Sequence, residues 1–386
     1  MSSTRMPQTT PVFGTAGVTR AWTDANGNFV ADCDLANPGA QDLRARGGDL
    51  CGVVSNVRFG MPVLTNAFDA KILSGWGVRP SDWNLVLSLQ QQIGRRSALD
   101  VAYTRRTFRG FTVADNLALA PSDLTPFSIL APLDGRLPGG GGYRIDGLYD
   151  IAPGKAGQVD NRVTGAASYG RWFQYFSGLD VTVHARVGRS FTFAGGTSTG
   201  QTVADNCEVR AHLPELATTA TGTTAFGGGL TGSAVTPLSP YCHVGYGVLT
   251  QLRGLSSYLV PRLDVEIGAT FQSKPGALLA ANWSAPAATI ATFLGRAPSG
   301  NVPNVTINLI EPGSLYGDRI NQLDFRFAKK FQFGGSRTMI ALDLYNSLNA
   351  NPVLTYNNSF TPGGPWLQAN SILTGRLARV SAEWTF

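Results

Sequence analysis

The sequence predicts an all-β fold, and more specifically an antiparallel transmembrane β-barrel segment with long extracellular loops. Three observations predict it. Apolar and polar residues alternate in short segments, short turns alternate with long links, and charged residues make up only 15% of the chain, against about a quarter in ordinary soluble proteins. The polarity of the chain comes instead from glycine, serine, threonine and asparagine, as in barrels with long loops.

The closing run of the sequence alternates strictly between two kinds of residue. One face carries Ala378, Val380, Ala382, Trp384 and Phe386, and the other carries Arg379, Ser381, Glu383 and Thr385. A period of two is that of a β-strand with one apolar and one polar face. Small apolar and aromatic groups opposite mixed charges form the pattern of an outer-membrane barrel strand.

Two further strands precede this run. Apolar residues alternate with polar ones from Leu323 to Phe333, and the link Gly334-Gly335-Ser336 returns the chain into 339–344. Paired glycines are typical of a tight hairpin, because they adopt positive φ without steric cost. Lys329 falls on the apolar face, so we expect it near a membrane interface, where a lysine extends its charge into water.

Earlier segments repeat the pattern. An alternating segment runs from Trp83 to Thr104 with a turn at 94–96. A second alternating segment covers 179–193 with a turn at 188–189. A further strand ends near Val260, turns at 261–262 and continues with Asp264, Glu266, Gly268 and Thr270 on one face. Long links cover 110–169, 197–248 and 273–316, and residues 1–82 show no sustained alternation.

The lengths of the connections predict the topology. Outer-membrane barrels place short turns in the periplasm and long loops outside the cell. The four short turns therefore predict about nine membrane strands in residues 83–386, with residues 1–82 as an extracellular-loop region. Because a self-contained bacterial barrel has an even number of strands, an odd count predicts the C-terminal portion of a larger barrel. We expect a signal peptide to be absent from this chain.

Composition excludes some classes of protein. The net charge of +6 is scattered, without a lysine-rich run, which argues against nucleic-acid binding. No run approaches the roughly 18 to 20 consecutive apolar residues of a membrane helix.

The four cysteines fall into two local pairs, Cys33 with Cys51 and Cys207 with Cys242. Four cysteines permit three pairings, and the alternative is four unpaired buried thiols. We expect local pairing, because each disulfide closes a short loop in an oxidising compartment and stabilises it by roughly 3 kcal/mol.

Asp24, Asn26, Asn28 and Asp32 place oxygen atoms at alternate positions, as at the start of a calcium-binding loop. The pattern then departs from that loop, because Gly27 comes two positions too early and Leu35 stands where a bidentate glutamate belongs. The two interpretations are a structural calcium site and an Asn-Gly turn held by side-chain hydrogen bonds.

Residues 196–200 match the Gly-x-Ser-x-Gly motif of hydrolases, with Asp205, His212 and His243 following in order. That motif requires a helix directly after Ser198, and 201–206 have no helical period, so we expect no enzyme activity.

Trp366 lies near Asn357 and Asn358 in a long link, where it either stacks on a planar ligand or sugar or packs within the loop.

Several separated segments resemble one family. They are Asp32–Leu35 (DCDL), Gly75–Pro80 (GWGVRP), Leu137–Tyr143 (LPGGGGY), Tyr316–Asp324 (YGDRINQLD), Leu342–Asn349 (LDLYNSLN) and the ending Arg376–Phe386. Together they resemble the barrel of Oar-like TonB-dependent outer-membrane receptors, which have a carboxypeptidase-regulatory-like front domain and are abundant in Acidobacteria.

The resemblance implies a 22-stranded barrel in the bacterial outer membrane, surrounded by lipid, that takes up a scarce small molecule such as a siderophore or an oligosaccharide. It implies a plug domain and TonB as partners through a missing N-terminal part. We expect no cofactor apart from the structural calcium considered above. It also implies that the barrel-assembly machinery reads Val380, Ala382, Trp384 and Phe386. The alternatives are a secreted or surface β-rich binding or adhesion protein and a small self-contained porin.

Overall fold

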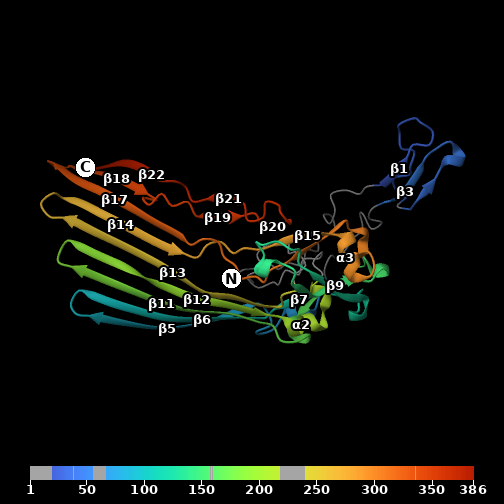
Figure 1. Cartoon of the computed structure of the whole chain (residues 1–386), viewed down its shortest axis with the longest axis horizontal. Coiled ribbons are helices and arrows are strands. Elements are labelled where there is room, and N and C mark those ends of the chain that lie inside the picture. Colours follow the sequence, from blue (N-terminus) through green and yellow to red (C-terminus); the bar gives the residue numbers. More distant parts are fainter. Residues whose placement is uncertain are drawn as a thin grey trace.

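The computed structural model describes residues 20–37, 39–54, 67–156, 158, 160–217, 240–334 and 336–386. A sheet of nine antiparallel strands dominates these residues, with its strands in the order β22-β18-β17-β14-β13-β12-β11-β6-β5 (Figure 1). The strands are β5 (Ser81–Ile93), β6 (Ser97–Arg109), β11 (Phe173–Val187), β12 (Phe191–Asp205), β13 (His243–Val260), β14 (Val265–Lys274), β17 (Ile320–Phe333), β18 (Ser336–Tyr345) and β22 (Leu377–Thr385). The all-β, antiparallel fold class is confirmed.

The pairing register keeps residues of one kind in rows across the sheet. Ile267 lies opposite Phe327, which lies opposite Leu342, which lies opposite Val380. The adjacent row has Gly268, Arg326, Asp343 and Arg379 in the same order. Because neighbouring residues of a strand point to opposite faces, the sheet has one apolar face and one polar face. We call these the apolar face and the polar face.

Four short turns connect strands at one end of the sheet, which we call the turn end (Figure 1). They lie between β5 and β6, β11 and β12, β13 and β14, and β17 and β18, as the sequence predicts. Two details of the prediction are wrong. Asp264 belongs to a turn, where its φ is 51°, because β14 begins at Val265. The link expected at 197–248 covers only 206–242, since β12 and β13 are longer than expected.

The long connections gather at the other end of the sheet, which we call the loop end (Figure 1). They carry short strands and helices of their own: β7 (Thr112–Asn116), β8 (Leu124–Leu130), β9 (Arg144–Ile151), β10 (Asn161–Gly165), α2 (Cys207–His212), β15 (Asn282–Pro286), α3 (Ala287–Leu294), β16 (Asn304–Asn308), β19 (Val353–Tyr356), β20 (Ser359–Phe360) and β21 (Ala369–Ile372). Strand β15 pairs with both β16 and β20, so connections distant in sequence share one small sheet.

A hydrophobic core lies among these connections. It unites buried side chains from the β6–β11, β14–β17 and β18–β22 connections: Phe127, Ile129, Leu148, Trp283, Ile290, Ile307, Leu309, Phe360 and Trp366. A second cluster joins Phe111 and Val113 to Val209 and Leu213 of the β12–β13 connection. The loop end is therefore a packed assembly, which we call the loop cap.

The residues before β5 form separate small elements. Strands β1 (Arg20–Thr23), β2 (Gln41–Asp42) and β3 (Leu50–Val54) make a three-stranded sheet, and β4 (Ala67–Phe68) and α1 (Ala70–Leu73) follow, with β4 pairing with β10. Within the described residues, none of the helices is both long and apolar enough to cross a membrane.

Candidate functional site

Large apolar side chains are exposed along the apolar face from one edge strand of the sheet to the other. Leu89 of β5 is 64% exposed, Leu179 of β11 is 45% exposed and Val380 of β22 is 73% exposed. The buried cores, by contrast, lie in the loop cap. An apolar surface of this extent is typical of a site that binds lipid or protein.

Some polar groups on the apolar face have partners or lie near its ends. Thr199 and Thr250, on the adjacent strands β12 and β13, join their hydroxyl groups at 3.0 Å. Lys329 is exposed near the turn end of β17, with its Nζ 5.3 Å from the centre of the Phe331 ring. Lys329 therefore lies near one end of the apolar surface, and its place at a membrane interface stays a prediction.

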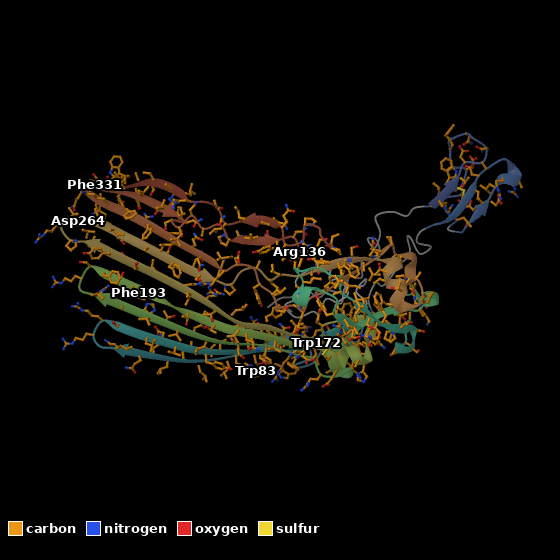
Figure 2. The ribbon with its side chains drawn as sticks, viewed as in Figure 1. Trp83, Arg136, Trp172, Phe193, Asp264 and Phe331 are labelled. Carbon is orange, nitrogen blue, oxygen red and sulfur yellow. A yellow bond between two sulfur atoms is a disulfide. The ribbon has the colours of Figure 1, made fainter. Side chains whose placement is uncertain are left out.

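Aromatic side chains mark both ends of the apolar face. Trp83 lies toward the loop end, and Phe193 and Phe331 lie toward the turn end (Figure 2). At the turn end of β22, the rings of Trp384 and Phe386 meet edge to face with centroids 6.3 Å apart. Aromatic rings at both borders of an apolar band are typical of proteins that contact a membrane interface.

The polar face is hollowed near its middle. A cavity of about 720 Å³ is lined by side chains from five strands, including Asp180, Ser198, Arg253, Gln272 and Asp324. Gln272 donates to Gln322 at 2.8 Å, and Gln322 donates to both carboxylate oxygens of Asp324 at 3.0 Å. These amides and carboxylates can hydrogen-bond a polar solute or another protein segment.

An ion-pair network connects the last three strands on the same face. Asp343 of β18, which is 4% exposed, accepts hydrogen bonds from Arg326 of β17 at 3.0 Å and from Arg379 of β22 at 2.9 Å. A buried carboxylate between two guanidinium groups is electrostatically satisfied. The network therefore ties β22 to the sheet.

A second cavity, of about 710 Å³, lies closer to the turn end. Its lining includes His184, Asp100, Arg96 and Arg186, and His184 Nε2 lies 3.6 Å from Asp100 Oδ2. Both cavities therefore combine acidic and basic groups.

In the loop cap, Arg136 bridges two connections that are distant in sequence. It pairs with Asp134 at 2.6 Å and donates to the backbone carbonyl groups of Gly364 at 2.8 Å and Trp366 at 3.3 Å. The side-chain hydrogen bond from Arg136 lowers the pKa of the Asp134 carboxyl well below its usual value, with help from the Arg136 and Gly363 amides. This cluster fixes the β18–β22 connection to the β6–β11 connection.

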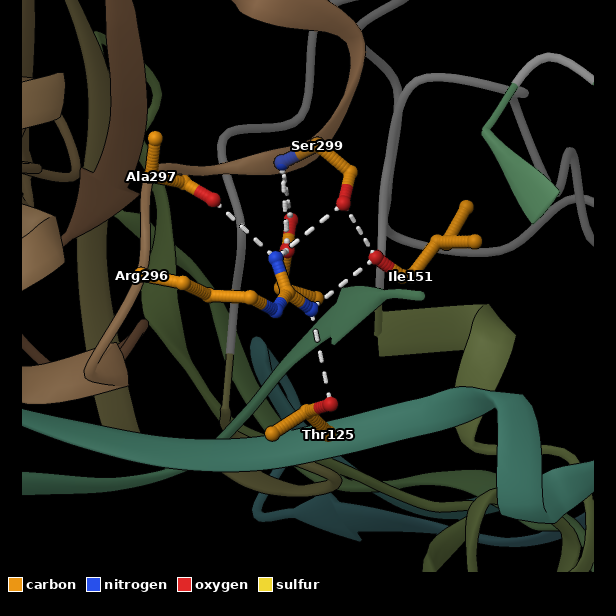
Figure 3. A network of polar contacts seen from close by, with 6 residues as sticks. Thr125, Ile151, Arg296, Ala297 and Ser299 are labelled. Carbon is orange, nitrogen blue, oxygen red and sulfur yellow. Dashed lines mark hydrogen bonds and ion pairs between the residues drawn. The ribbon is translucent and has the colours of Figure 1, made fainter. Parts of the chain in front are cut away.

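Arg296 forms a similar bridge at the end of α3 (Figure 3). It donates to Asp150 at 2.5 Å and to the carbonyl of Ile151 at 3.1 Å, and Ser299 also hydrogen-bonds Ile151. In addition, Tyr143 and Tyr241 both donate to the carbonyl of Leu309, at 2.9 and 3.0 Å. Three connections thus meet at one backbone oxygen.

Both of the expected disulfides are present in the structure. Cys33 is joined to Cys51 in the small β1–β3–β2 sheet, and Cys207 is joined to Cys242 across the base of the β12–β13 connection. Each therefore closes a local loop.

The residues considered for calcium hold their own loop together. The Asp24 carboxylate accepts from the amides of Gly27 at 2.7 Å and Phe29 at 3.0 Å, and Asn26 donates to Asp32 at 2.7 Å. Asn28 Oδ1 accepts from the amide of Val30 at 2.7 Å. These contacts are those of the side-chain-stabilised turn, and a structural calcium stays a prediction.

The hydrolase-like residues are not brought together as a triad. Ser198 lies within β12 on the polar face, opposite Asp180 and Gln251, with β-structure on both sides. Asp205 Oδ2 accepts a hydrogen bond from His243 Nδ1 at 2.8 Å, but Asp205 lies seven residues further along β12 than Ser198, roughly 24 Å at 3.4 Å per residue. Residues 227–232, a glycine-rich stretch, lie outside the described residues.

Trp366 packs within the loop cap, which supports packing within the loop over stacking on a planar ligand or sugar. It is 3% exposed, donates from Nε1 to the Ala280 carbonyl at 2.8 Å and meets Phe360 edge to face at 5.1 Å. Asn357 and Asn358 likewise hydrogen-bond neighbouring backbone groups. Nothing in the sequence singles out Arg136 or Arg296. By contrast, Trp283 and Ala285 are apolar residues two positions apart, as are Ile307 and Leu309, and this spacing marks two of the short buried strands.

No protein-family model and no curated protein matches the chain. Among solved structures, it is similar to the outer membrane transporter YddB from Escherichia coli, with 10% sequence identity and a TM-score of 0.40. The likeness covers 78% of this chain and 32% of that chain, so this chain spans about a third of the length of the transporter.

Proposed function

We propose that the chain is the C-terminal β-barrel part of a TonB-dependent outer-membrane receptor that takes up a scarce nutrient, such as a siderophore or an oligosaccharide. The observation that carries the proposal is the exposed apolar face that extends over nine strands. A soluble protein would cover such a face with a second layer, and a barrel wall turns it toward lipid.

The dimensions of this face fit a membrane. On β5, the apolar-face residues from Leu85 to Ile93 cover eight residue steps, roughly 27 Å at 3.4 Å per residue. Tilted by about 40°, such a strand crosses roughly 20 Å, close to the ~25 Å apolar band of outer-membrane barrels. The short turns would lie in the periplasm and the loop cap at the cell surface, where a nutrient arrives.

The polar face supports the receptor part of the proposal. In a barrel it would face the interior, where a plug domain that responds to TonB would contact the hydrogen-bonding groups of the 720 Å³ cavity. The resemblance in sequence to Oar-like receptors supports this choice of family, and Val380, Ala382, Trp384 and Phe386 would present the assembly signal on the apolar face of β22. The alternative of a secreted binding protein has no layer to cover that face within the described residues.

Adjacent residues on opposite faces test the proposal. Leu89→Lys places a charge on the apolar face at a side chain that is 64% exposed, and Gln90→Lys places it on the polar face. In lipid the Leu89 variant should lose about 2 to 4 kcal/mol of stability and most of its urea-resistant membrane association, while the Gln90 variant keeps both. If both variants behave alike and the chain is recovered without detergent, the proposal is wrong.

A further inference from the structure

The apolar face of β5, β6 and β11 changes character near the loop end. The row formed by Leu87, Tyr103 and Leu179 is apolar, and the next row toward the loops contains Leu85, Arg105 and Ser177. Arg109 follows four residues later on the same face of β6. Arg105 and Arg109 therefore lie at the border where the apolar surface ends.

Aromatic rings hold both arginines in place. The guanidinium carbon of Arg105 lies 3.5 Å from the centre of the Tyr175 ring, and its Nη1 donates to Ser177 Oγ at 2.5 Å. The guanidinium of Arg109 lies 6.0 Å from the ring of Trp83, which is 69% exposed. A guanidinium that uses its face against a ring keeps N–H donors at its edge for an anion.

The neighbouring Arg106 shows a different arrangement. It points to the polar face and pairs with Asp82 at 2.7 Å. Among the residues that the structure describes, neither Arg105 nor Arg109 forms an ion pair with a carboxylate. Of these three arginines, the two that form no ion pair within the described part of the chain are thus those on the apolar face, at its border.

We propose that Arg105 and Arg109, with Tyr175 and Trp83, bind the phosphate group of a lipid headgroup in the leaflet nearest the loop cap. The inference rests on the proposed function, because it requires lipid along the apolar face. The acyl chains of such a lipid cover the row of Leu87, Tyr103 and Leu179, and its phosphate lies at the depth of Arg105.

The chemistry favours a lipid phosphate over a phosphate ion. A guanidinium fork binds two phosphate oxygens at once, and Trp and Tyr rings are enriched at the level of lipid headgroups. A free phosphate ion meets the same donors but gains no contact with the apolar row below them. The lipid should therefore bind much more tightly than the ion.

The test uses the full chain in neutral detergent and native mass spectrometry. Phosphatidic acid is the probe, diacylglycerol with the same chains is the phosphate-free control, and inorganic phosphate is the competitor. Arg105→Gln/Arg109→Gln removes the proposed site, and Arg186→Gln/Arg253→Gln removes the same charge from the polar face. Heat-modifiable migration on a gel checks that every variant is folded.

We expect the wild type and the polar-face variant to retain phosphatidic acid, and the Arg105/Arg109 variant to bind it at least about tenfold more weakly, as loss of charge-assisted hydrogen bonds implies. Equal binding by both double variants, or equal binding of diacylglycerol, would overturn the proposal. Displacement of the lipid by equimolar inorganic phosphate would also overturn it, since it would show a simple anion site. Failure of the wild type to enter detergent or lipid at all would instead overturn the proposed function.

Discussion

The carboxylate of Asp343 accepts a hydrogen bond from Arg379 at 2.9 Å, and this contact joins β22 to β18 on the polar face. Arg326 contacts the other oxygen of the same carboxylate at 3.0 Å. The strand that carries the proposed assembly signal is therefore held by a charge network as well as by its backbone ladder.

Asp343→Asn should weaken that attachment. It leaves two arginines without their anion, and because both are partly exposed we expect a loss of about 2 kcal/mol in the free energy of unfolding. The urea midpoint of the chain in detergent measures it. Glu383→Gln on the polar face of β22 is the matched control and should change the midpoint little; an equal effect of the two would show that the network adds no stability.

Loss of the Cys207–Cys242 disulfide should loosen the β12–β13 connection. The disulfide spans 35 residues, and loop closure of that length is worth about 4 kcal/mol. The Cys207→Ser/Cys242→Ser variant should therefore unfold at lower urea concentration than the wild type. Non-reducing peptide mapping checks the pairing itself, and a peptide that joins Cys33 to Cys207 would show that the assignment is wrong.

The lowered pKa of Asp134 determines how the stability of the loop cap should change as the pH falls. Arg136 lowers the pKa of this carboxyl, so its contribution to stability is complete above the ordinary aspartate pKa of about 4 and disappears as the pH falls toward the lowered value. The difference in thermal midpoint between wild type and Asp134→Asn should be constant from pH 7 to 5 and should shrink below pH 4.

The control for this pH series is Asp146→Asn. Asp146 pairs with Arg144 at 2.6 Å, but both side chains are about two-thirds exposed, so the substitution should have little effect at any pH. A difference for Asp134→Asn that grows as the pH falls from 5 to 3 would contradict the assigned role of its carboxylate.

Replacement of the aromatic pair on β22 tests the assembly signal. Trp384→Asn/Phe386→Asn should lower insertion into the outer membrane far more than it lowers the stability of barrels already formed, because each exposed interfacial ring contributes only about 1 to 3 kcal/mol. The folded, heat-modifiable band of the complete receptor measures insertion. Ser381→Ala on the polar face is the control, and equal insertion of the two variants would refute the signal.

The strands of the large sheet could be predicted from the sequence because the signals that mark strands and tight turns lie within a few neighbouring residues. A period of two in residues such as Leu85, Leu87 and Leu89 determines which face each side chain takes, and glycines such as Gly94 and Gly188, both at positive φ, mark the turns. The loop-end half of β12 was missed because Thr197–Thr202 is polar or small on both faces, which removes the alternation.

The loop cap could not be predicted in the same way. Strands β15 and β16 are five residues each, and β20 has two, so their stability comes from contacts with distant segments. Trp366 is buried by contacts with distant segments, among them Ala280 and Phe360. The arginine bridges follow from the same long-range packing, and spacing along the chain does not reveal them.

The most direct test of the proposed membrane-embedded receptor is to measure whether the apolar face meets lipid or water in a membrane. Single cysteines replace Leu342, which is 42% exposed on the apolar face of β18, and Thr270, which is exposed at the polar-face cavity. The native cysteines are all in disulfides and do not react with maleimide. In vesicles, a water-soluble maleimide should label the cysteine at 270 and spare the one at 342, which a lipid-soluble maleimide should label instead. Rapid labelling of the cysteine at 342 by the water-soluble reagent would show that the apolar face meets water, and it would contradict the membrane-embedded receptor.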